Sequence, residues 1–271
     1  MAQSRRKIII GSNGNIALRL KQQYRDAEVV PRSKFLSWQH PQDLKGTFKK
    51  ENCDIYLAIG VLSKLAPKQI LERVNVEIPQ LIAEIIQGTQ SRMITFGSIM
   101  ELDEEICNTN AYIASKRQLS EQLKSSMERE HFLHLRLHTL YGGKKLHSEM
   151  FLGQLFSAIK TKSTFCMSGG QQIREYHHID DDLRALSLFL LNSYNGVREV
   201  THNEVFTLKE LAMAVLAHFE MSELLVVGEV ETPSFEVFKP LGIKDELLNY
   251  LDFRPTLEGI IKDFNQRLES P

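Results

Sequence analysis

Short apolar runs alternate with longer amphipathic stretches through the first half of this sequence. The runs are rich in β-branched residues, and a short continuous apolar run is typical of a strand that is buried on both faces. The expected strands are residues 7–11, 28–30, 54–59, 92–96 and 132–137, and the expected helices are 15–24, 68–87 with a break at Pro79, and 111–130. Strands that alternate with helices predict an α/β fold with a doubly wound parallel sheet covered on both faces.

The pattern changes after Tyr141-Gly142-Gly143. Helices are expected at 149–162, 181–193 and 207–219, separated by glycine-containing turns and short β-like segments. We therefore expect two domains. Residues 1–143 would form the sheet domain, and residues 144–271 a smaller C-terminal substrate-binding lobe that is interleaved with the last strands of the sheet.

Charge and cysteine content exclude several classes of protein. The chain has 33 Lys and Arg against 34 Asp and Glu, a net charge of −1, which argues against a general nucleic-acid or membrane-surface binder. Cys53, Cys107 and Cys166 are widely spaced, which suits a reducing compartment better than a disulfide framework. The apolar run Ile8–Ile10 is too short for a signal peptide or a membrane span. We expect a cytoplasmic protein.

A glycine pattern separates the first expected strand from the first expected helix. In KIIIGSNGNIAL, Gly11 would make a tight turn, Gly14 would let the backbone approach a pyrophosphate, and Ala17 would allow close packing of helix on strand. The helix N-terminus would then offer N–H groups to the phosphates. The pattern predicts a dinucleotide-binding turn, and the alternative is an ordinary turn.

The end of the second expected strand is basic. An acidic residue at this point usually holds the ribose 2′-OH of NAD. Here VVPRSK provides Arg32, Ser33 and Lys34 instead, and two cations with a hydroxyl suit a 2′-phosphate. We predict NADP as cofactor, with NAD as the alternative cofactor. A solvated basic loop is the alternative interpretation.

A tyrosine and a lysine lie four residues apart in AYIASKRQL. Tyr112 and Lys116 would therefore share one face of a helix. A phenol has an ordinary pKa of about 10, and a neighbouring ammonium is expected to lower it so that the pair can exchange a proton with a carbonyl or alcohol. Ser98 follows the fourth expected strand and could hydrogen-bond the same substrate oxygen.

In this order, glycine turn, serine, tyrosine and lysine, the sequence resembles the short-chain dehydrogenase/reductase superfamily and more closely its extended branch, which modifies nucleotide sugars. The segment REYHHIDD is especially similar to that of GDP-fucose synthases. The resemblance implies a Rossmann-like dinucleotide-binding domain. The matching segments are GSNGNIA at 11–17, DIYLAI at 54–59, RVNVEIPQLI with Asn75, GSIM at 97–100, YIASK at 112–116, RLHTLYGG at 136–143, REYHHIDD at 174–181 and FTLKELA at 206–212.

The resemblance implies a role for each matching position. Tyr112 would donate a proton to a sugar keto group, and Lys116 would bind the nicotinamide ribose and tune Tyr112. Ser98 would orient the carbonyl, and Asn75 would steady a water near the lysine. Arg174 would contact the nucleotide part of the substrate. Extended relatives often dimerise through the helices that hold Asn75 and Tyr112, which leaves a homodimer open.

Two further sets of residues are candidates for binding. The cofactor set is Gly11, Asn13, Gly14, Asn15, Ile16, Arg32, Ser33, Lys34, Ala58 and Lys116. The substrate set is Ser98, Met100, Tyr112, Lys144 and Arg174.

The sequence also departs from the fucose-synthase pattern. That type needs a Cys just after the serine and a His in the second lobe for epimerisation. Met100 stands where that type has the Cys, and methionine cannot transfer a proton. His147 is the nearest candidate for the His, but its position in the sequence does not align with that of the family's His. The gap between Ser98 and Tyr112 is short, which leaves the identity of the sugar open. We therefore predict ketone reduction without epimerisation.

The predicted function is an NADP-dependent reductase of a nucleotide-activated 4-keto-6-deoxy sugar, an enzyme of deoxysugar biosynthesis. A nucleotide-sugar epimerase or dehydratase that retains its dinucleotide is the first alternative. A dinucleotide-sensing regulatory protein on the same fold is the second. No metal is expected, because His131, His134 and His138 have no carboxylate or Cys at ligand spacing.

Overall fold

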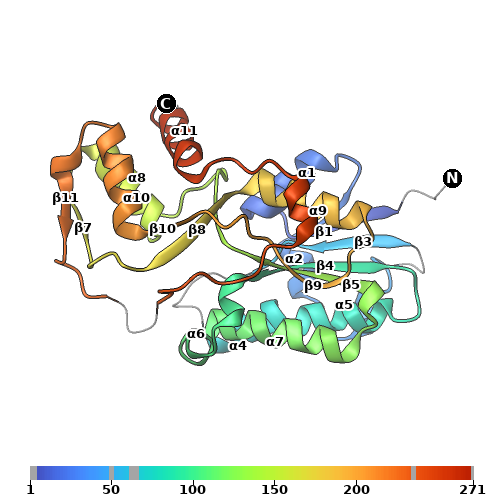
Figure 1. The fold of residues 1–271 in the computed structure, drawn as a ribbon. Coiled ribbons are helices and arrows are strands. Elements are labelled where there is room, and N and C mark those ends of the chain that lie inside the picture. The colour runs from blue at the N-terminus through green and yellow to red at the C-terminus, as the bar shows by residue number, and fades with distance from the viewer. Residues whose placement is uncertain (1–4, 49–51, 61–66, 233–235, 270–271) are drawn as a thin grey trace. The chain divides into compact units, whose positions relative to one another are not determined.

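The computed structural model describes residues 5–48, 52–60, 67–232 and 236–269 (Figure 1). The chain divides into two compact units. Residues 1–137 and 186–200 form the first unit, and residues 138–185 and 201–271 form the second. The chain therefore leaves the first unit after residue 137 and returns to it for residues 186–200.

A six-stranded parallel sheet forms the centre of the first unit, in the order β2-β1-β3-β4-β5-β9. Every neighbouring pair in this sheet is parallel. All residues of β3 and β5 are buried, including the polar residues Asp54, His134 and Arg136, as expected for parallel strands covered on both faces. The strands are β1 (Arg6–Ile10), β2 (Glu28–Val30), β3 (Cys53–Leu57), β4 (Arg92–Ser98), β5 (Phe132–Leu137) and β9 (Gly196–Glu199).

Helices cover both faces of this sheet, with α1 on one face and α5 and α7 on the other (Figure 1). Four short helical segments, α2, α3, α6 and the 3-10 helix η2, were not expected from the sequence. The helical segments that lie wholly in this unit are α1 (Asn15–Gln23), α2 (Arg32–Leu36), α3 (Pro41–Leu44), α4 (Lys68–Glu72), η1 (Arg73–Glu77), α5 (Ile78–Ile86), η2 (Ile99–Leu102), α6 (Glu104–Thr109), α7 (Ala111–Ser126) and η3 (Arg129–His131).

The irregularity expected at Pro79 takes the form of a π-helical turn. Segments α4, η1 and α5 follow one another without a break, and η1 is the π-helix. Pro79 lies in the first turn of α5 and has no N–H to donate to a carbonyl one turn earlier. Asn75, a candidate site residue, lies in η1 and is buried.

The second unit contains two small sheets. Strand β8 lies between β10, which is antiparallel to it, and β6, which is parallel to it, and β7 pairs with β11. Its helices pack around a core that includes Leu155, Leu211 and Phe264. The elements are β6 (Thr139–Tyr141), α8 (Phe151–Thr161), β7 (Phe165–Met167), β8 (Ile173–His178), β10 (Val205–Thr207), α10 (Leu208–His218), η4 (Ser222–Leu224), β11 (Leu225–Val227), η5 (Glu246–Tyr250) and α11 (Thr256–Glu269); helix α9 (Ile179–Leu191) runs from this unit into the first.

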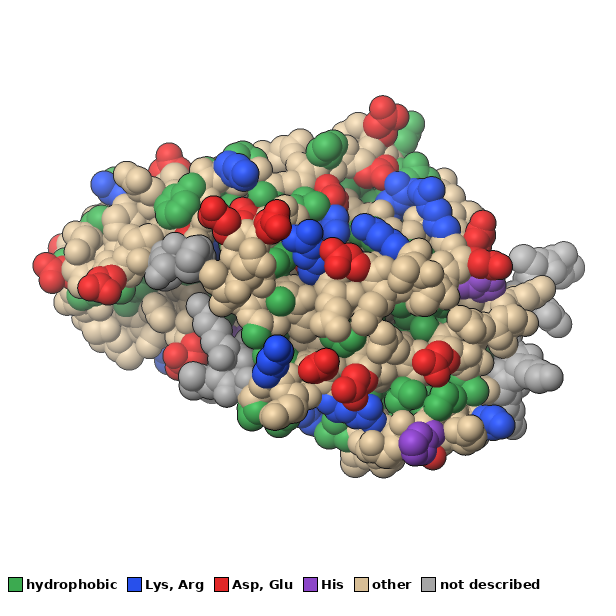
Figure 2. Space-filling view, turned by 90° about the horizontal axis from the view of Figure 1, so that it is seen from below, with side chains coloured by type: hydrophobic (Ala, Val, Ile, Leu, Met, Phe, Trp, Pro, Cys, Tyr) green, Lys and Arg blue, Asp and Glu red, His purple; other side chains and the backbone are tan. Residues whose placement is uncertain are grey.

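The surface carries charges of both signs. On the face drawn in Figure 2, Lys and Arg side chains are interspersed with Asp and Glu side chains, and neither sign forms a continuous patch. This distribution matches the near balance of charges in the sequence. Among the described residues, no helix is both long and apolar enough to cross a bilayer.

Candidate active site

Gly11 makes a tight turn directly after β1. Its φ angle is +107°, and a Cβ at this position would lie 2.5 Å from the Ala58 carbonyl oxygen. Its N–H donates to the Val30 carbonyl oxygen at 2.9 Å. The turns that follow β1, β2 and β3 therefore meet at the carboxyl edge of the parallel sheet, where ligands of such folds bind.

Gly14 is the N-cap of α1, and the space that a Cβ would occupy at this residue is open. A Cβ here would meet nothing closer than the Ala58 carbonyl oxygen at 3.9 Å, and its φ of −73° is accessible to any residue. The surrounding protein therefore does not require glycine at this position. Ala17, one turn further along the helix, is fully buried. Of the neighbouring candidates, Asn13 is exposed, and Asn15 and Ile16 are partly buried.

The basic segment after β2 is a short helix. Arg32, Ser33 and Lys34 belong to the five-residue helix α2, and all three are exposed. The helix begins here because Pro31, extended at the N-cap, accepts the N–H groups of Lys34 and Phe35 with its carbonyl oxygen, so the loop of the alternative interpretation is not what forms. The three polar side chains remain available to solvent next to the Gly11 turn.

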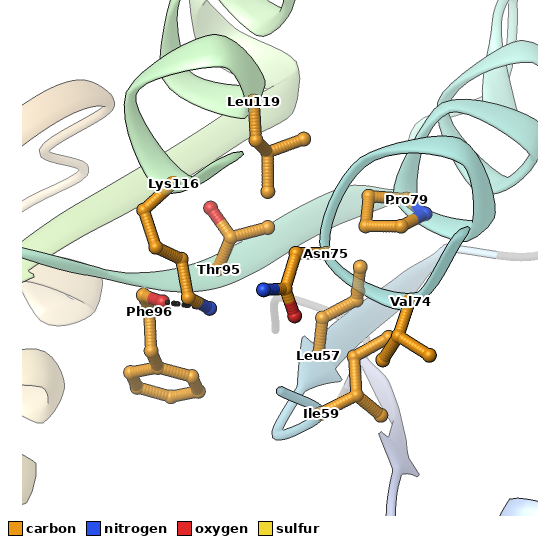
Figure 3. Close-up of a pocket in the computed structure, with 9 residues that line it drawn as sticks. All are labelled: Leu57, Ile59, Val74, Asn75, Pro79, Thr95, Phe96, Lys116 and Leu119. Carbon is orange, nitrogen blue, oxygen red and sulfur yellow. Dashed lines mark hydrogen bonds between the residues drawn. The ribbon is translucent and has the colours of Figure 1, made fainter. Parts of the chain in front are cut away.

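Tyr112 and Lys116 lie one turn apart near the start of α7. The Asn110 side chain caps this helix by accepting the N–H groups of Tyr112 and Ile113. Lys116 Nζ lies 5.8 Å from the centroid of the Tyr112 ring. It also donates to the Phe96 carbonyl oxygen of β4 at 2.9 Å (Figure 3). This bond fixes the buried lysine between α7 and the end of β4.

Burial moves the pKa of Tyr112 and that of Lys116 in opposite directions. Burial lowers the pKa of Lys116 to about 8, although the Glu101 carboxylate acts against the decrease. Burial raises the pKa of Tyr112 above its ordinary value, and the Glu101 carboxylate raises it further. The expected lowering of the Tyr112 pKa is therefore wrong, because loss of hydration at the phenolate and the Glu101 carboxylate both raise it.

Ser98 ends β4 and caps the 3-10 helix η2. Its Oγ accepts the Met100 N–H at 3.3 Å, and its own N–H donates to Glu101 Oε1 at 2.7 Å. This is a reciprocal capping box. The contact with Met100 uses an oxygen lone pair and leaves the hydroxyl hydrogen for another acceptor. The Met100 side chain is partly buried.

Glu101 is a buried carboxylate held by three neighbours. It is 2% exposed, and besides the Ser98 N–H it contacts His134 Nε2 at 3.2 Å and Arg136 Nε at 3.2 Å. Burial alone would raise its pKa, but His134, the Ser98 N–H and Arg136 together lower it to about 2. A Cβ at Gly97 would lie 2.2 Å from both Glu101 Oε1 and His134 Nε2, so the glycine leaves room for this pair.

Asn75 and Lys116 face a small cavity beneath the site. Its volume is about 10 Å³, at the lower limit of the roughly 10–15 Å³ that a cavity needs to hold one water. Asn75 Nδ2 donates to Ser115 Oγ at 2.9 Å, and Ser115 Oγ donates to the Tyr112 carbonyl oxygen at 2.7 Å. The residues that line the cavity are Leu57, Ile59, Val74, Asn75, Pro79, Thr95, Phe96, Lys116 and Leu119 (Figure 3).

Two candidate substrate residues belong to the second unit. Lys144 is exposed in the segment after β6. Arg174 lies on β8, forms an ion pair with Glu236 and donates to the Ile173 carbonyl oxygen. Both roles stay predictions.

Glu101 and His134 were missed as site residues from the sequence. Glu101 had a readable signal, since Ser98-x-x-Glu101 is a capping box. His134 did not, because its contact with Glu101 depends on the pairing of β4 with β5, in which His134 lies opposite Thr95.

A parallel sheet with a glycine turn, an open helix N-terminus and a Tyr–Lys pair beside the end of β4 defines a Rossmann-like α/β protein. The chain belongs to the NAD dependent epimerase/dehydratase family, whose model matches residues 15–203. This match confirms the resemblance to the extended short-chain dehydrogenases/reductases. The likeness to GDP-fucose synthases stays a prediction.

Solved structures of low sequence identity share this fold. WbmG from Bordetella bronchiseptica in complex with NAD has a TM-score of 0.77 at 15% identity, over 98% of this chain and 96% of that one. A dTDP-4-dehydrorhamnose reductase from Bacillus anthracis in complex with NADP has a TM-score of 0.75 at 15% identity, over 97% and 99%. A UDP-N-acetylglucosamine 4-epimerase from Methanobrevibacter ruminantium has a TM-score of 0.76 at 14% identity, over 98% of each chain. No curated protein sequence matches significantly. The predicted fold class is confirmed.

Proposed function

We propose that this protein is an NADP-dependent reductase of a nucleotide-activated 4-keto-6-deoxy sugar. The observation that carries the proposal is the Tyr112–Lys116 pair, whose lysine is bonded to the Phe96 carbonyl oxygen of β4, two residues before Ser98. Acid–base groups at the carboxyl edge of a parallel sheet lie where such folds bind dinucleotides and substrates.

The residues at this edge fit a dinucleotide. The space beside the Cα of Gly14 is open, although the protein's own packing does not require glycine there, and the nine-residue helix α1 begins at this point with N–H groups that could bind an anion. Arg32 and Lys34, exposed on α2, suit a 2′-phosphate. The structural relatives solved with NAD and with NADP support a nicotinamide cofactor. A bound nicotinamide would supply the hydride.

Tyr112 would donate the proton to the substrate oxygen. Its raised pKa keeps the phenol protonated at neutral pH, which is the form that a proton donor needs. Lys116, partly charged near its pKa of about 8, would stabilise the phenolate that remains after transfer. Asn75 and the cavity beside Lys116 provide space for one water that could return a proton.

Ser98 would hydrogen-bond the same substrate oxygen. Its Oγ already accepts the Met100 N–H, so the hydroxyl can donate outward. Glu101 fixes the Ser98 backbone through its N–H. Since Met100 offers no group that could move a proton to or from a sugar carbon, we propose reduction without epimerisation.

The experiment is NADPH oxidation measured with a panel of nucleotide 4-keto-6-deoxy sugars. We expect turnover with at least one of them. Tyr112→Phe should abolish turnover and keep dinucleotide binding, whereas the control Tyr250→Phe, at a residue that is 82% exposed, should behave like wild type. Full activity of Tyr112→Phe would remove this residue from the mechanism.

A nucleotide-sugar epimerase or dehydratase is the second candidate. An epimerase and DesIV, a dTDP-glucose 4,6-dehydratase from Streptomyces venezuelae with NAD bound, are as similar to this chain in structure as the reductase. These activities regenerate their cofactor in each cycle. Dinucleotide that stays bound through purification and is not consumed would favour this candidate, whereas stoichiometric consumption of added NADPH would favour the reductase.

A further inference from the structure

Histidine and acidic side chains form a second buried cluster, which lies wholly in the second unit. His138 precedes β6, Glu175 and His177 lie on β8, Asp182 lies on α9, and His202 precedes β10. The side chains of His138, Glu175, His177, Asp182 and His202 are each at most 8% exposed. The active-site proposal uses none of these residues.

Three of these side chains bring ligand atoms to one point. The donor atoms of His138, Glu175 and His177 all lie within 4.8 Å of one another. His138 Nε2 lies 3.4 Å from Glu175 Oε2. Zinc–nitrogen bonds of about 2.0–2.1 Å place the donors of a tetrahedral site roughly 3.3–3.4 Å apart, so this distance already suits a shared ion. His202 Nε2, at 3.9 Å from Glu175 Oε1, is the nearest further donor.

Two buried atoms of the cluster, His138 Nε2 and Asp182 Oδ2, lack a hydrogen bond to any residue that the structure describes, and the first of them belongs to the group of three ligand atoms. Within the described residues, His138 Nε2 is buried and has no hydrogen-bond partner, although the Glu175 carboxylate lies near it. A buried polar atom without a hydrogen bond carries a cost in free energy that a metal–ligand bond would remove. The imidazole of His138 is therefore better explained as a ligand than as part of a completed hydrogen-bond network.

The other two ligands have the supporting contacts that metal sites use. His177 Nδ1 is hydrogen-bonded to Asp182 Oδ1 at 2.6 Å, which directs Nε2 toward Glu175. A carboxylate on the far nitrogen of a ligating histidine is the usual support in such sites. The Glu175 carboxylate accepts the Thr201 hydroxyl and the His202 N–H, so its position is also fixed.

We propose that His138, Glu175 and His177 bind a divalent transition-metal ion of the zinc type, with Asp182 orienting His177. Two imidazoles and one carboxylate favour zinc and its neighbours over magnesium or calcium, which prefer oxygen ligands. When the ion binds, the hydrogen bond from His177 Nε2 to Glu175 breaks, the proton on Nε2 passes to solvent, and the nitrogen lone pair forms the bond to the metal. The site could not be predicted from the spacing of ligand residues in the sequence, because His138 and Glu175 are far apart along the chain.

The test is equilibrium binding of zinc chloride to the full-length protein after treatment with a chelator. We expect one zinc per chain and no comparable binding of magnesium. His138→Leu replaces one ligand with an apolar side chain of similar size, and it should weaken zinc binding at least tenfold. The control His218→Gln, at an exposed residue of α10, should bind zinc like wild type. Equal affinity in His138→Leu and wild type, or no stoichiometric binding, would overturn the proposal.

X-ray absorption of the zinc-loaded wild-type protein tests the ligands without any substitution, in case His138→Leu does not fold. The proposal requires nitrogen and oxygen neighbours at about 2.0–2.2 Å with scattering from at least two imidazoles. A sulfur neighbour at about 2.3 Å, or fewer than two imidazoles, would contradict it, because the cluster contains no cysteine.

Discussion

Glu101 is the residue that links the electrostatics of the Tyr–Lys pair to the geometry of the serine. Burial is the larger cause of both pKa shifts, but the Glu101 carboxylate raises the pKa of Tyr112 and that of Lys116. At neutral pH its charge therefore favours a protonated phenol and a charged ammonium together. Because the same carboxylate accepts the Ser98 N–H, one buried charge supports all three groups.

At the same scale, the charge of Lys116 should control the pH dependence of turnover. Since burial lowers its pKa to about 8, the ammonium is lost as the pH rises through this value, and turnover should fall with it. In Lys116→Arg the guanidinium, with an ordinary pKa above about 12, stays charged, so the fall should move to higher pH even if the maximal rate is lower. The check is the pH profile of kcat for both proteins. An unchanged basic limb in Lys116→Arg would show that another group titrates there.

At the scale of elements, most strands of the main sheet could be predicted from the sequence, whereas side-chain contacts that depend on the pairing of strands could not. Strands β2 and β5 were predicted with their observed bounds, and β5 is buried along its whole length. Strand β9 has only four residues and no continuous apolar run, so it was missed. Tyr112 and Lys116 could be paired from their spacing alone, whereas the contact between Glu101 and His134 needs the register of β4 on β5.

The packing of β4 against Glu101 and His134 gives an element-scale prediction. A Cβ at Gly97 would lie 2.2 Å from both side chains, so Gly97→Ala should displace them, destabilise the protein by about 1–3 kcal/mol and reduce kcat more than dinucleotide affinity. The matched control is Gly46→Ala, because a Cβ at Gly46 has no neighbour within 4 Å. Urea unfolding and steady-state kinetics check both effects. Wild-type stability of Gly97→Ala would mean that the pair moves at no cost.

The residues proposed to determine the preference for NADP over NAD lie on helix α2. Arg32→Ala should weaken NADPH binding about tenfold, or about 1.4 kcal/mol, and change NADH binding little, because only NADPH has the 2′-phosphate. Arg25→Ala, at an exposed cation beyond the other end of α1, is the control for a general loss of positive charge. Fluorescence titration with each dinucleotide measures the effect. An equal loss for NADPH and NADH would contradict the assignment.

At the scale of the whole molecule, the chain completes its main sheet only after passing through part of the second unit. Strand β9 pairs with β5 from Leu133 opposite Gly196 to Arg136 opposite Glu199. The segment that returns also contributes Leu186, Phe189 and Val200, each of them fully buried. The first unit is therefore not a continuous stretch of sequence, although its glycine turn and its Tyr–Lys pair both precede residue 138.

This topology predicts that residues 1–143 cannot form a stable domain alone. Without residues 186–200, β5 becomes an open edge strand and its apolar neighbours lose their cover, which favours aggregation. We expect the fragment to show no cooperative thermal unfolding by circular dichroism. Joining residues 186–200 to it through a flexible Gly/Ser linker restores the missing strand and should recover cooperative unfolding. A sharp transition in the fragment of residues 1–143 alone would show that β9 is dispensable, and that the sequence division after residue 143 describes an independent folding unit.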